Sequence, residues 1–377
     1  MTVSARWFAA LLLGTALLAP AGALSTPPDE QPRQDRAKKR QPTTKPGPTT
    51  MRAKPKLPKG FLSRKLKLPS GAERKYVVFV PPQYVLKKSH RWPVVVFLHG
   101  SGECGTDGVK HTTVGLPTLL AAHPEKYPFI AVMPQAPTMW FREENALAVW
   151  MALDAVMKEY QTDPDRIYLT GLSMGGFATW ELSIERPDVF AAIVPVCGVA
   201  PLDYLSNIVA MPAWVFHGEM DDRVPVAASR EAVAELKRLG AEPKYTEYPG
   251  VKHNSWDRAY PTPELWKWLL KQRRRPPPRV IDYRLPGGAV QVWWLALQAE
   301  QPLESPAHIH AEISEDDRTV TVESEGVEGW AIGSDMCPLK AGGAIEVTWN
   351  GRRIYAGEFT GRFEAQQRPT TQPAESP

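Results

Sequence analysis

Short runs of consecutive apolar residues recur along residues 61–272, and amphipathic segments separate them. Residues 94–98 form such a run, Val-Val-Val-Phe-Leu, which is typical of a strand in a sheet covered on both faces. Comparable runs occupy 76–80, 129–133, 167–170, 190–196 and 213–216, with a weaker one at 245–248. The segments 146–160 and 229–239 repeat apolar residues every three or four positions, as one face of a helix does. This alternation predicts a doubly wound, mostly parallel α/β sheet whose ligands bind at the carboxyl ends of the strands.

A different pattern begins after the proline-rich linker at 273–279, where apolar and polar residues alternate as in half-buried strands. Asn350-Gly351 is a strong hairpin signal. The pattern predicts a small all-β, sandwich-like domain over 280–363 and a disordered tail at 364–377. The expected strands are 290–297, 308–313, 319–323 and 345–349. Their tryptophans could form a sugar-binding face, although core packing is the commoner use of such positions.

The N-terminal region follows neither pattern. Residues 1–23 combine Arg6, an apolar stretch from Trp7 to Leu18 and the small residues Ala21-Gly22-Ala23. These features predict a signal peptide and an exported protein, periplasmic or secreted, with a retained anchor as the alternative. Residues 24–60 are proline-rich and carry ten Lys/Arg against three Asp/Glu, so we expect a disordered basic linker. No transmembrane segment is expected in the mature chain.

The charge and the cysteine content of the chain limit the kinds of partner and metal that are expected. The chain of 377 residues has a formal net charge of +4, but the basic N-terminal region accounts for all of it and leaves residues 61–377 mildly acidic. Nucleic acid is therefore not an expected partner. Three cysteines are too few for a disulfide scaffold, although Cys104 and Cys197 both follow predicted strands and could pair. No metal-binding spacing links the cysteines, and His308 and His310, which share one face of an expected strand, have no third ligand in view, so no metal site is expected.

One motif carries a specific chemistry. The strand 167–170 runs directly into Gly171-Leu172-Ser173-Met174-Gly175, and a helical stretch from Phe177 follows. A G-x-S-x-G sequence between a strand and a helix is typical of a sharp turn that exposes a nucleophilic serine above the sheet. Ser173 is the candidate nucleophile, and the alternative is a tight turn with an idle serine.

A serine nucleophile needs a base, which is held in turn by a carboxylate. In this fold the acid and then the histidine follow the serine along the chain, which favours His253, in the loop after 245–248. The acid is expected in the loop after 213–216, where Glu219, Asp221 and Asp222 all qualify by residue type.

The glycine-rich loop His99-Gly100-Ser101-Gly102-Glu103 follows the strand at 94–98. Enzymes with this nucleophile turn place one backbone donor of the oxyanion hole in such a loop and the other just after the serine. We therefore expect the amide N–H groups of Ser101 and Met174 to form the hole. The two histidines that end their strands, His99 and His217, are interpreted as structural.

Four blocks in order resemble secreted α/β-hydrolase serine esterases, the polyhydroxybutyrate-depolymerase-like, feruloyl-esterase-like and dienelactone-hydrolase-like group often catalogued as predicted peptidases. The blocks are 98–103, 165–176, 217–225 and 253–257. In that group the acid takes the fifth position of H-G-x-x-D-x-x-V-P, which here is Asp221. The resemblance implies no cofactor and a carboxylic ester substrate, a small molecule or an ester on a polysaccharide. Trp140 is expected to line the acyl pocket, or else to pack on the surface.

The sequence therefore predicts an exported serine carboxylesterase that works through an acyl-enzyme. One rival is a peptidase of the prolyl-oligopeptidase type, although residues 24–60 are too few for the propeller that usually precedes such a domain. The other rival is a non-catalytic surface binding protein whose working part is the β-domain.

Overall fold

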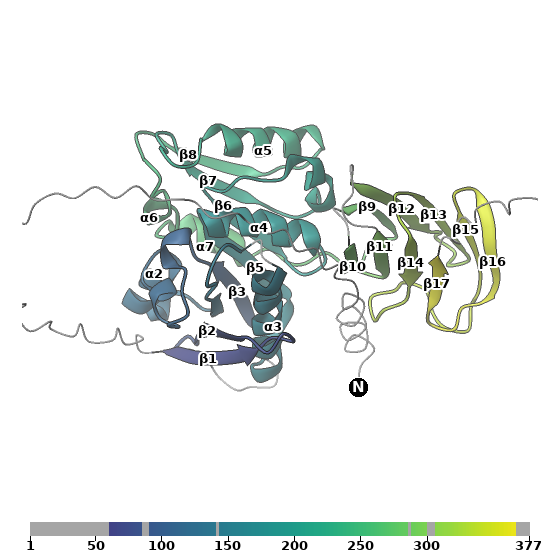
Figure 1. Cartoon of the computed structure of the whole chain (residues 1–377), viewed down its shortest axis with the longest axis horizontal. Helices are drawn as coiled ribbons and strands as arrows, with labels where there is room; N and C mark the ends of the chain where they lie inside the picture. The colour runs from purple at the N-terminus through teal and green to yellow at the C-terminus, as the bar shows by residue number, and fades with distance from the viewer. Residues whose placement is uncertain (1–59, 85–89, 141–142, 286–287, 300–305, 367–377) are drawn as a thin grey trace, which may run out of the picture. The chain divides into compact units, whose positions relative to one another are not determined.

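The computed structural model describes residues 60–84, 90–140, 143–285, 288–299 and 306–366 (Figure 1). The predicted signal peptide at 1–23 and all of the predicted linker except Gly60 lie outside the described residues, as does most of the predicted tail. No helix in the described ranges has the length and apolar character needed to cross a membrane.

An eight-stranded sheet is formed within residues 61–248, in the order β1-β2-β4-β3-β5-β6-β7-β8 (Figure 1). Both β1 and β4 pair with β2 in antiparallel fashion, and the other neighbours are parallel. The predicted mostly parallel sheet is thus confirmed. Its strands are β1 (Phe61–Lys67), β2 (Glu73–Phe79), β3 (Trp92–Leu98), β4 (Ile130–Pro134), β5 (Thr162–Leu172), β6 (Ala192–Val196), β7 (Trp214–Gly218) and β8 (Lys244–Tyr248).

Helices cover both faces of this sheet. Successive side chains of a strand point to opposite faces, so each strand contributes residues to two buried clusters. Val94 and Val96 of β3 belong to one buried cluster, with side chains of α3, α4 and α5. Val95 and Phe97 belong to another, with side chains of α2 and α7. The helices are α2 (Leu116–Ala122), α3 (Glu143–Glu159), α4 (Met174–Glu185), α5 (Ala227–Arg238), α6 (Trp256–Ala259) and α7 (Pro263–Leu269). Short 3-10 turns are η1 (Ser101–Glu103), η2 (Lys110–Thr112), η3 (Pro124–Lys126) and η4 (Leu202–Ile208).

The C-terminal part forms two further sheets, of five strands in the order β16-β15-β13-β12-β9 and of four in the order β10-β11-β14-β17. Side chains from both sheets, among them Ile309 and Trp330, share one buried cluster. The strands are β9 (Val280–Leu285), β10 (Gly288–Val292), β11 (Leu295–Ala299), β12 (Ala307–Ile313), β13 (Thr319–Glu325), β14 (Gly329–Ile332), β15 (Ala344–Trp349), β16 (Arg352–Glu358) and β17 (Phe363–Gln366).

Two predictions for this part need correction. The strand expected over 290–297 is two strands, β10 and β11, because the chain reverses at Trp293, whose φ is 48°. The tail expected from 364 begins with strand residues, since β17 continues to Gln366 by pairing with β14. The hairpin at Asn350-Gly351 is confirmed, and both residues have the positive φ that a type I′ turn requires.

Candidate active site

A sharp turn joins β5 to α4 at Ser173, which has φ 53° and ψ −120°. A non-glycine residue rarely has positive φ, so the surrounding chain must hold this conformation in place. Glycines permit the close packing: a Cβ on Gly171 would overlap the carbonyl of Gly175, and a Cβ on Gly175 would overlap the carbonyl of Leu98. The G-x-S-x-G sequence therefore positions the serine at the carboxyl end of β5, at the N-terminus of a helix.

The imidazole of His253 reaches this serine from the loop after β8. Its Nε2 lies 2.9 Å from Ser173 Oγ, and its Nδ1 lies 2.8 Å from Oδ2 and 3.0 Å from Oδ1 of Asp221, in the loop after β7. The structure thus brings the three expected side chains into one hydrogen-bonded row, although 80 residues separate Ser173 from His253. This geometry allows a proton to pass from the serine to the imidazole while the carboxylate holds the ring.

The other two carboxylates of the loop after β7 lie elsewhere. Asp222 has a half-exposed side chain that faces Lys252 at 3.7 Å. Glu219 accepts a hydrogen bond from the amide of Gly250 at 2.8 Å. Neither contacts His253, so among the three candidates only Asp221 has the geometry of the acid.

Asp221 is a buried carboxylate kept in its charged form. Burial by itself would raise its pKa, but the amide N–H of Val224, the imidazole of His253 and the amide N–H of Arg223 together hold the pKa below its ordinary value. Both amides donate to Oδ1, at 2.9 and 2.8 Å. The ring of His253 therefore faces a fixed negative charge.

His217 contacts the same carboxylate. This fully buried imidazole lies with Nε2 3.2 Å from Asp221 Oδ2 and 3.0 Å from the carbonyl of Val224, and with Nδ1 2.7 Å from Ser229 Oγ. Burial lowers its pKa, so the ring is neutral and its Nε2–H donates to these oxygens. The structural role expected for His217 did not include this contact, and the one signal for it in the sequence is the position of His217 near the end of β7, four residues before Asp221.

Known proteins resemble this chain both in sequence and in fold. The profile of the prolyl oligopeptidase family (Peptidase_S9) matches residues 148–209, which include the Ser173 turn. A crystal structure described as a thermostable esterase is 35% identical and superposes with a TM-score of 0.51 over 58% of this chain and 64% of that one. The comparisons thus show the α/β-hydrolase fold, and the matching profile and structures come from the group that includes esterases and S9 peptidases.

Curated relatives of the hydrolase match over short segments. Poly(3-hydroxyalkanoate) depolymerase C of Paucimonas lemoignei is 31% identical over 121 residues, which are 28% of this chain and 28% of that protein. The uncharacterized peptidase YuxL of Bacillus subtilis is 26% identical over 144 residues, which are 28% of this chain and 21% of that protein. The names divide between ester and peptide hydrolysis, so they agree on the reaction class and not on the substrate.

The two amides expected to form an oxyanion hole are those of Ser101 and Met174. Met174 begins α4 directly after the serine, and Ser101 begins η1 after β3 and the two residues His99 and Gly100. The close packing of Gly175 on the carbonyls of Leu98 and His99 brings these two segments together. Both amides stand at the first position of a helix, where an N–H group has no acceptor within the helix itself.

His99 and Trp140 hold the start of this loop through hydrogen bonds. Nδ1 of His99 donates to the carbonyl of Gly100 at 2.7 Å, and Nε2 accepts from the amide of Ala136 at 3.0 Å. Burial lowers the pKa of His99 to about 4, so the ring is neutral, and its interpretation as structural agrees with these contacts. Trp140 is 2% exposed and donates from its indole N–H to the carbonyl of His99 at 2.9 Å, so surface packing is wrong for it. A contact between Trp140 and an acyl group stays a prediction.

The three cysteines of the hydrolase are free thiols. Cys104 and Cys197 therefore do not pair, and the Cys104 thiol donates to the carbonyl of Thr138 at 3.3 Å instead. Cys197 is fully buried and lies beside the acid and the base, as described below.

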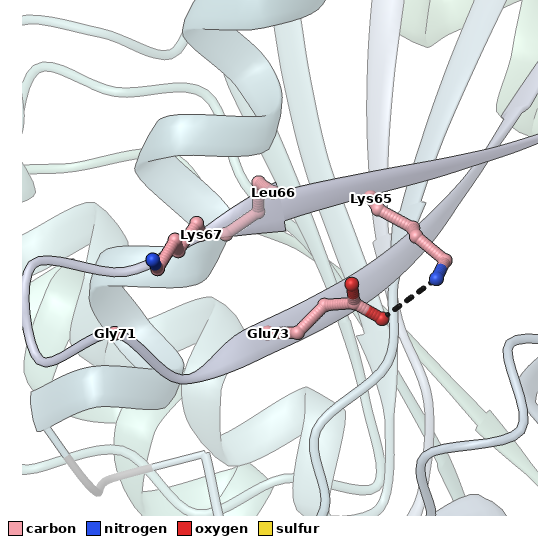
Figure 2. A pocket seen from close by; sticks show the side chains of 5 residues that line it. All are labelled: Lys65, Leu66, Lys67, Gly71 and Glu73. Carbon is pink, nitrogen blue, oxygen red and sulfur yellow. Dashed lines mark ion pairs between the residues drawn. The ribbon is translucent and has the colours of Figure 1, made fainter.

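A hollow is found at the hairpin of β1 and β2, lined by Lys65, Leu66, Lys67, Gly71 and Glu73 (Figure 2). Lys65 and Glu73 form an ion pair of 3.0 Å across it. These strands are at the opposite edge of the sheet from β7 and β8, which carry the acid and the base. The hollow thus contains none of the candidate site residues.

Proposed function

We propose that this α/β-hydrolase cleaves carboxylic esters through an acyl-enzyme, with Ser173 as nucleophile, His253 as general base and Asp221 as the acid that orients the base. The single observation that carries the proposal is the 2.9 Å contact between Ser173 Oγ and His253 Nε2. A neutral imidazole at that distance can remove the hydroxyl proton as the oxygen attacks a carbonyl carbon.

The two half-reactions use the same groups. Attack by Ser173 Oγ sends its proton to His253 Nε2 and makes a tetrahedral oxyanion, which the amide N–H groups of Ser101 and Met174 stabilise. Collapse of this intermediate expels the alcohol, which takes the proton from Nε2, and leaves the acyl group on the serine. Water then repeats the sequence, releasing the carboxylic acid and restoring the hydroxyl. Asp221 stabilises the imidazolium at each stage.

The sequence identities to known proteins favour ester substrates over peptide substrates. The thermostable esterase is 35% identical and the depolymerase 31%, whereas the peptidase YuxL is 26% identical. The matching family profile is nevertheless that of a peptidase family, so peptide hydrolysis is the second candidate function. In that case the leaving group is an amine and the same His253 proton is delivered to nitrogen.

The experiment is a substrate panel with matched variants. Wild-type protein is assayed with p-nitrophenyl esters of increasing acyl length, with feruloyl and acetyl esters, and with chromogenic peptides. Ester turnover at least about 10³-fold above Ser173→Ala supports the proposal. Turnover of peptides alone would establish the peptidase, and activity that survives in Ser173→Ala would remove Ser173 from the reaction. Absence of any turnover would favour a non-catalytic binding protein.

Three further predictions belong to this proposal. The domain organisation is a catalytic domain over 61–272, a linker at 273–279 and a sandwich-like domain built from the two C-terminal sheets. The protein is exported through its N-terminal 23 residues. Trp140, whose ring lies 4.8 Å from that of His99 beside the proposed oxyanion loop, borders the acyl pocket.

A further inference from the structure

Three side chains of metal-ligating type meet beside the proposed active site. One potential ligand atom each from Cys197, Asp221 and His253 lies within 4.8 Å of the other two. In tetrahedral zinc sites, bond lengths of about 2.0–2.3 Å put neighbouring ligand atoms roughly 3.3–3.6 Å apart. Small side-chain movements would therefore bring these three groups around one ion.

The backbone around Cys197 holds this residue next to Asp221 and His253. The residue follows β6 directly and has φ 43°, a backbone conformation that L-residues rarely adopt. Its amide donates to the carbonyl of Phe216 at 2.8 Å, which ties it to β7, and a Cβ on the next residue, Gly198, would overlap Gly176 of α4. The chain thus has little freedom to turn the thiol elsewhere.

A fourth group stands next to the thiol. The hydroxyl of Ser255 is fully buried and has no hydrogen-bond partner among the described residues. Burial raises the pKa of the Cys197 thiol to about 12, and the backbone of Ser173 and then the nearby hydroxyl of Ser255 act in the opposite direction. The thiol is thus protonated at neutral pH, and nothing in the proposed ester hydrolysis uses it.

We propose that Cys197, Asp221 and His253 form an inhibitory binding site for a thiophilic divalent cation such as Zn²⁺. Binding displaces the thiol proton and supplies one sulfur, one oxygen and one nitrogen ligand, a set that suits zinc. With the ion on one imidazole nitrogen and a proton on the other, His253 keeps no lone pair for the serine proton. The bound ion therefore stops hydrolysis, and this inhibition rests on the proposed function, whereas the binding does not.

The binding is tested first, with Co²⁺ as a spectroscopic substitute for Zn²⁺ on the full chain. A thiolate bound to Co²⁺ gives an intense charge-transfer band in the near ultraviolet. We expect the band in wild type and in Ser173→Ala, and we expect Zn²⁺ to abolish it by displacement. Cys197→Ser should lack the band, and the matched control Cys104→Ser should keep it. A wild-type protein without the band, or a band that survives in Cys197→Ser, would overturn the proposal.

Inhibition is tested on the same proteins with the best substrate of the panel. Zn²⁺ should inhibit wild type and Cys104→Ser, and a chelator should restore their activity. Cys197→Ser should keep its basal activity and need roughly 100-fold more Zn²⁺ for half inhibition, because it loses a direct ligand. Equal sensitivity of Cys197→Ser and wild type would overturn the proposal. If no substrate is found, the proposed function fails, and the cobalt band still decides the metal site.

Discussion

His217 and His253 contact the same oxygen of Asp221. Oδ2 lies 3.2 Å from Nε2 of His217 and 2.8 Å from Nδ1 of His253. The neutral, buried His217 thereby fixes the position of the carboxylate that orients the proposed base. This makes His217 a positioning residue, because it acts only through Asp221.

Removing the His217 N–H should therefore weaken catalysis without removing it. A hydrogen bond to a charged group contributes about 1.5–3 kcal/mol, so we expect His217→Phe to lower kcat roughly 10- to 100-fold with a smaller change in KM. Steady-state kinetics on protein with an intact melting transition is the measurement. Ser229→Ala, which removes only the outer partner of His217, should have a smaller effect. An unchanged kcat in folded His217→Phe would contradict this role.

The acid is assigned by a pair of neighbouring substitutions. Asp221→Asn should lower kcat about 10⁴-fold, because an amide no longer favours the imidazole tautomer that can accept the serine proton. Asp222→Asn should stay near wild type, since its exposed carboxylate faces Lys252 and not the base. Kinetics of both variants with one ester settles the assignment, and a damaged Asp222→Asn with an active Asp221→Asn would reverse it.

The turn at Ser173 depends on backbone packing that a single methyl group would disrupt. A Cβ on Gly175 would overlap the carbonyls of Leu98 and His99, so Gly175→Ala should lower the free energy of unfolding by about 3 kcal/mol or more. The control is Gly102→Ala, where nothing lies within 4 Å of the added Cβ. Chemical denaturation of the two variants measures the difference. Equal stabilities would mean that the turn tolerates a side chain at position 175.

Local patterns in the sequence were enough to predict the α/β sheet and the turn at Ser173. The apolar runs such as 94–98 are continuous because both faces of the sheet are covered, and the glycines around Ser173 stand where a Cβ cannot fit. The chain order of the fold selected His253. These features are encoded within a few residues of where they act, so a single sequence reveals them.

Other parts depend on contacts that no local pattern encodes. The reversal at Trp293 falls within a run of consecutive apolar residues that includes 292–295, and no glycine or proline marks the turn, so the sequence predicts a single strand there. Residue type alone did not separate Asp221 from Asp222, because only the path of the loop after β7 decides which carboxylate faces His253. The approach of Cys197 and His217 to Asp221 likewise joins the carboxyl ends of two strands, β6 and β7, and no periodic pattern in the sequence indicates it.

Glu181 of α4 gives the protein a pH-dependent stability. Burial, and then the negative charge of Glu185, raise the pKa of Glu181 to about 7, above the 4.5 of a free side chain. Between these pH values the folded state binds more protons than the unfolded state, so this group lowers stability as pH rises from 4.5 toward 7. Glu181→Gln should therefore raise the melting temperature at pH 8 by more than it does at pH 4. A gain of equal size at both pH values would contradict the shifted pKa.

The central claim is that Ser173 is a nucleophile activated by His253, and covalent labelling tests it without knowledge of the substrate. The protein is treated with a fluorophosphonate, which phosphonylates activated serines, and the modified residue is located by peptide mass spectrometry. We predict one phosphonyl group per chain, on Ser173, and its loss in Ser173→Ala and in His253→Ala. An unlabelled wild-type Ser173, or labelling that proceeds equally in His253→Ala, would contradict the account.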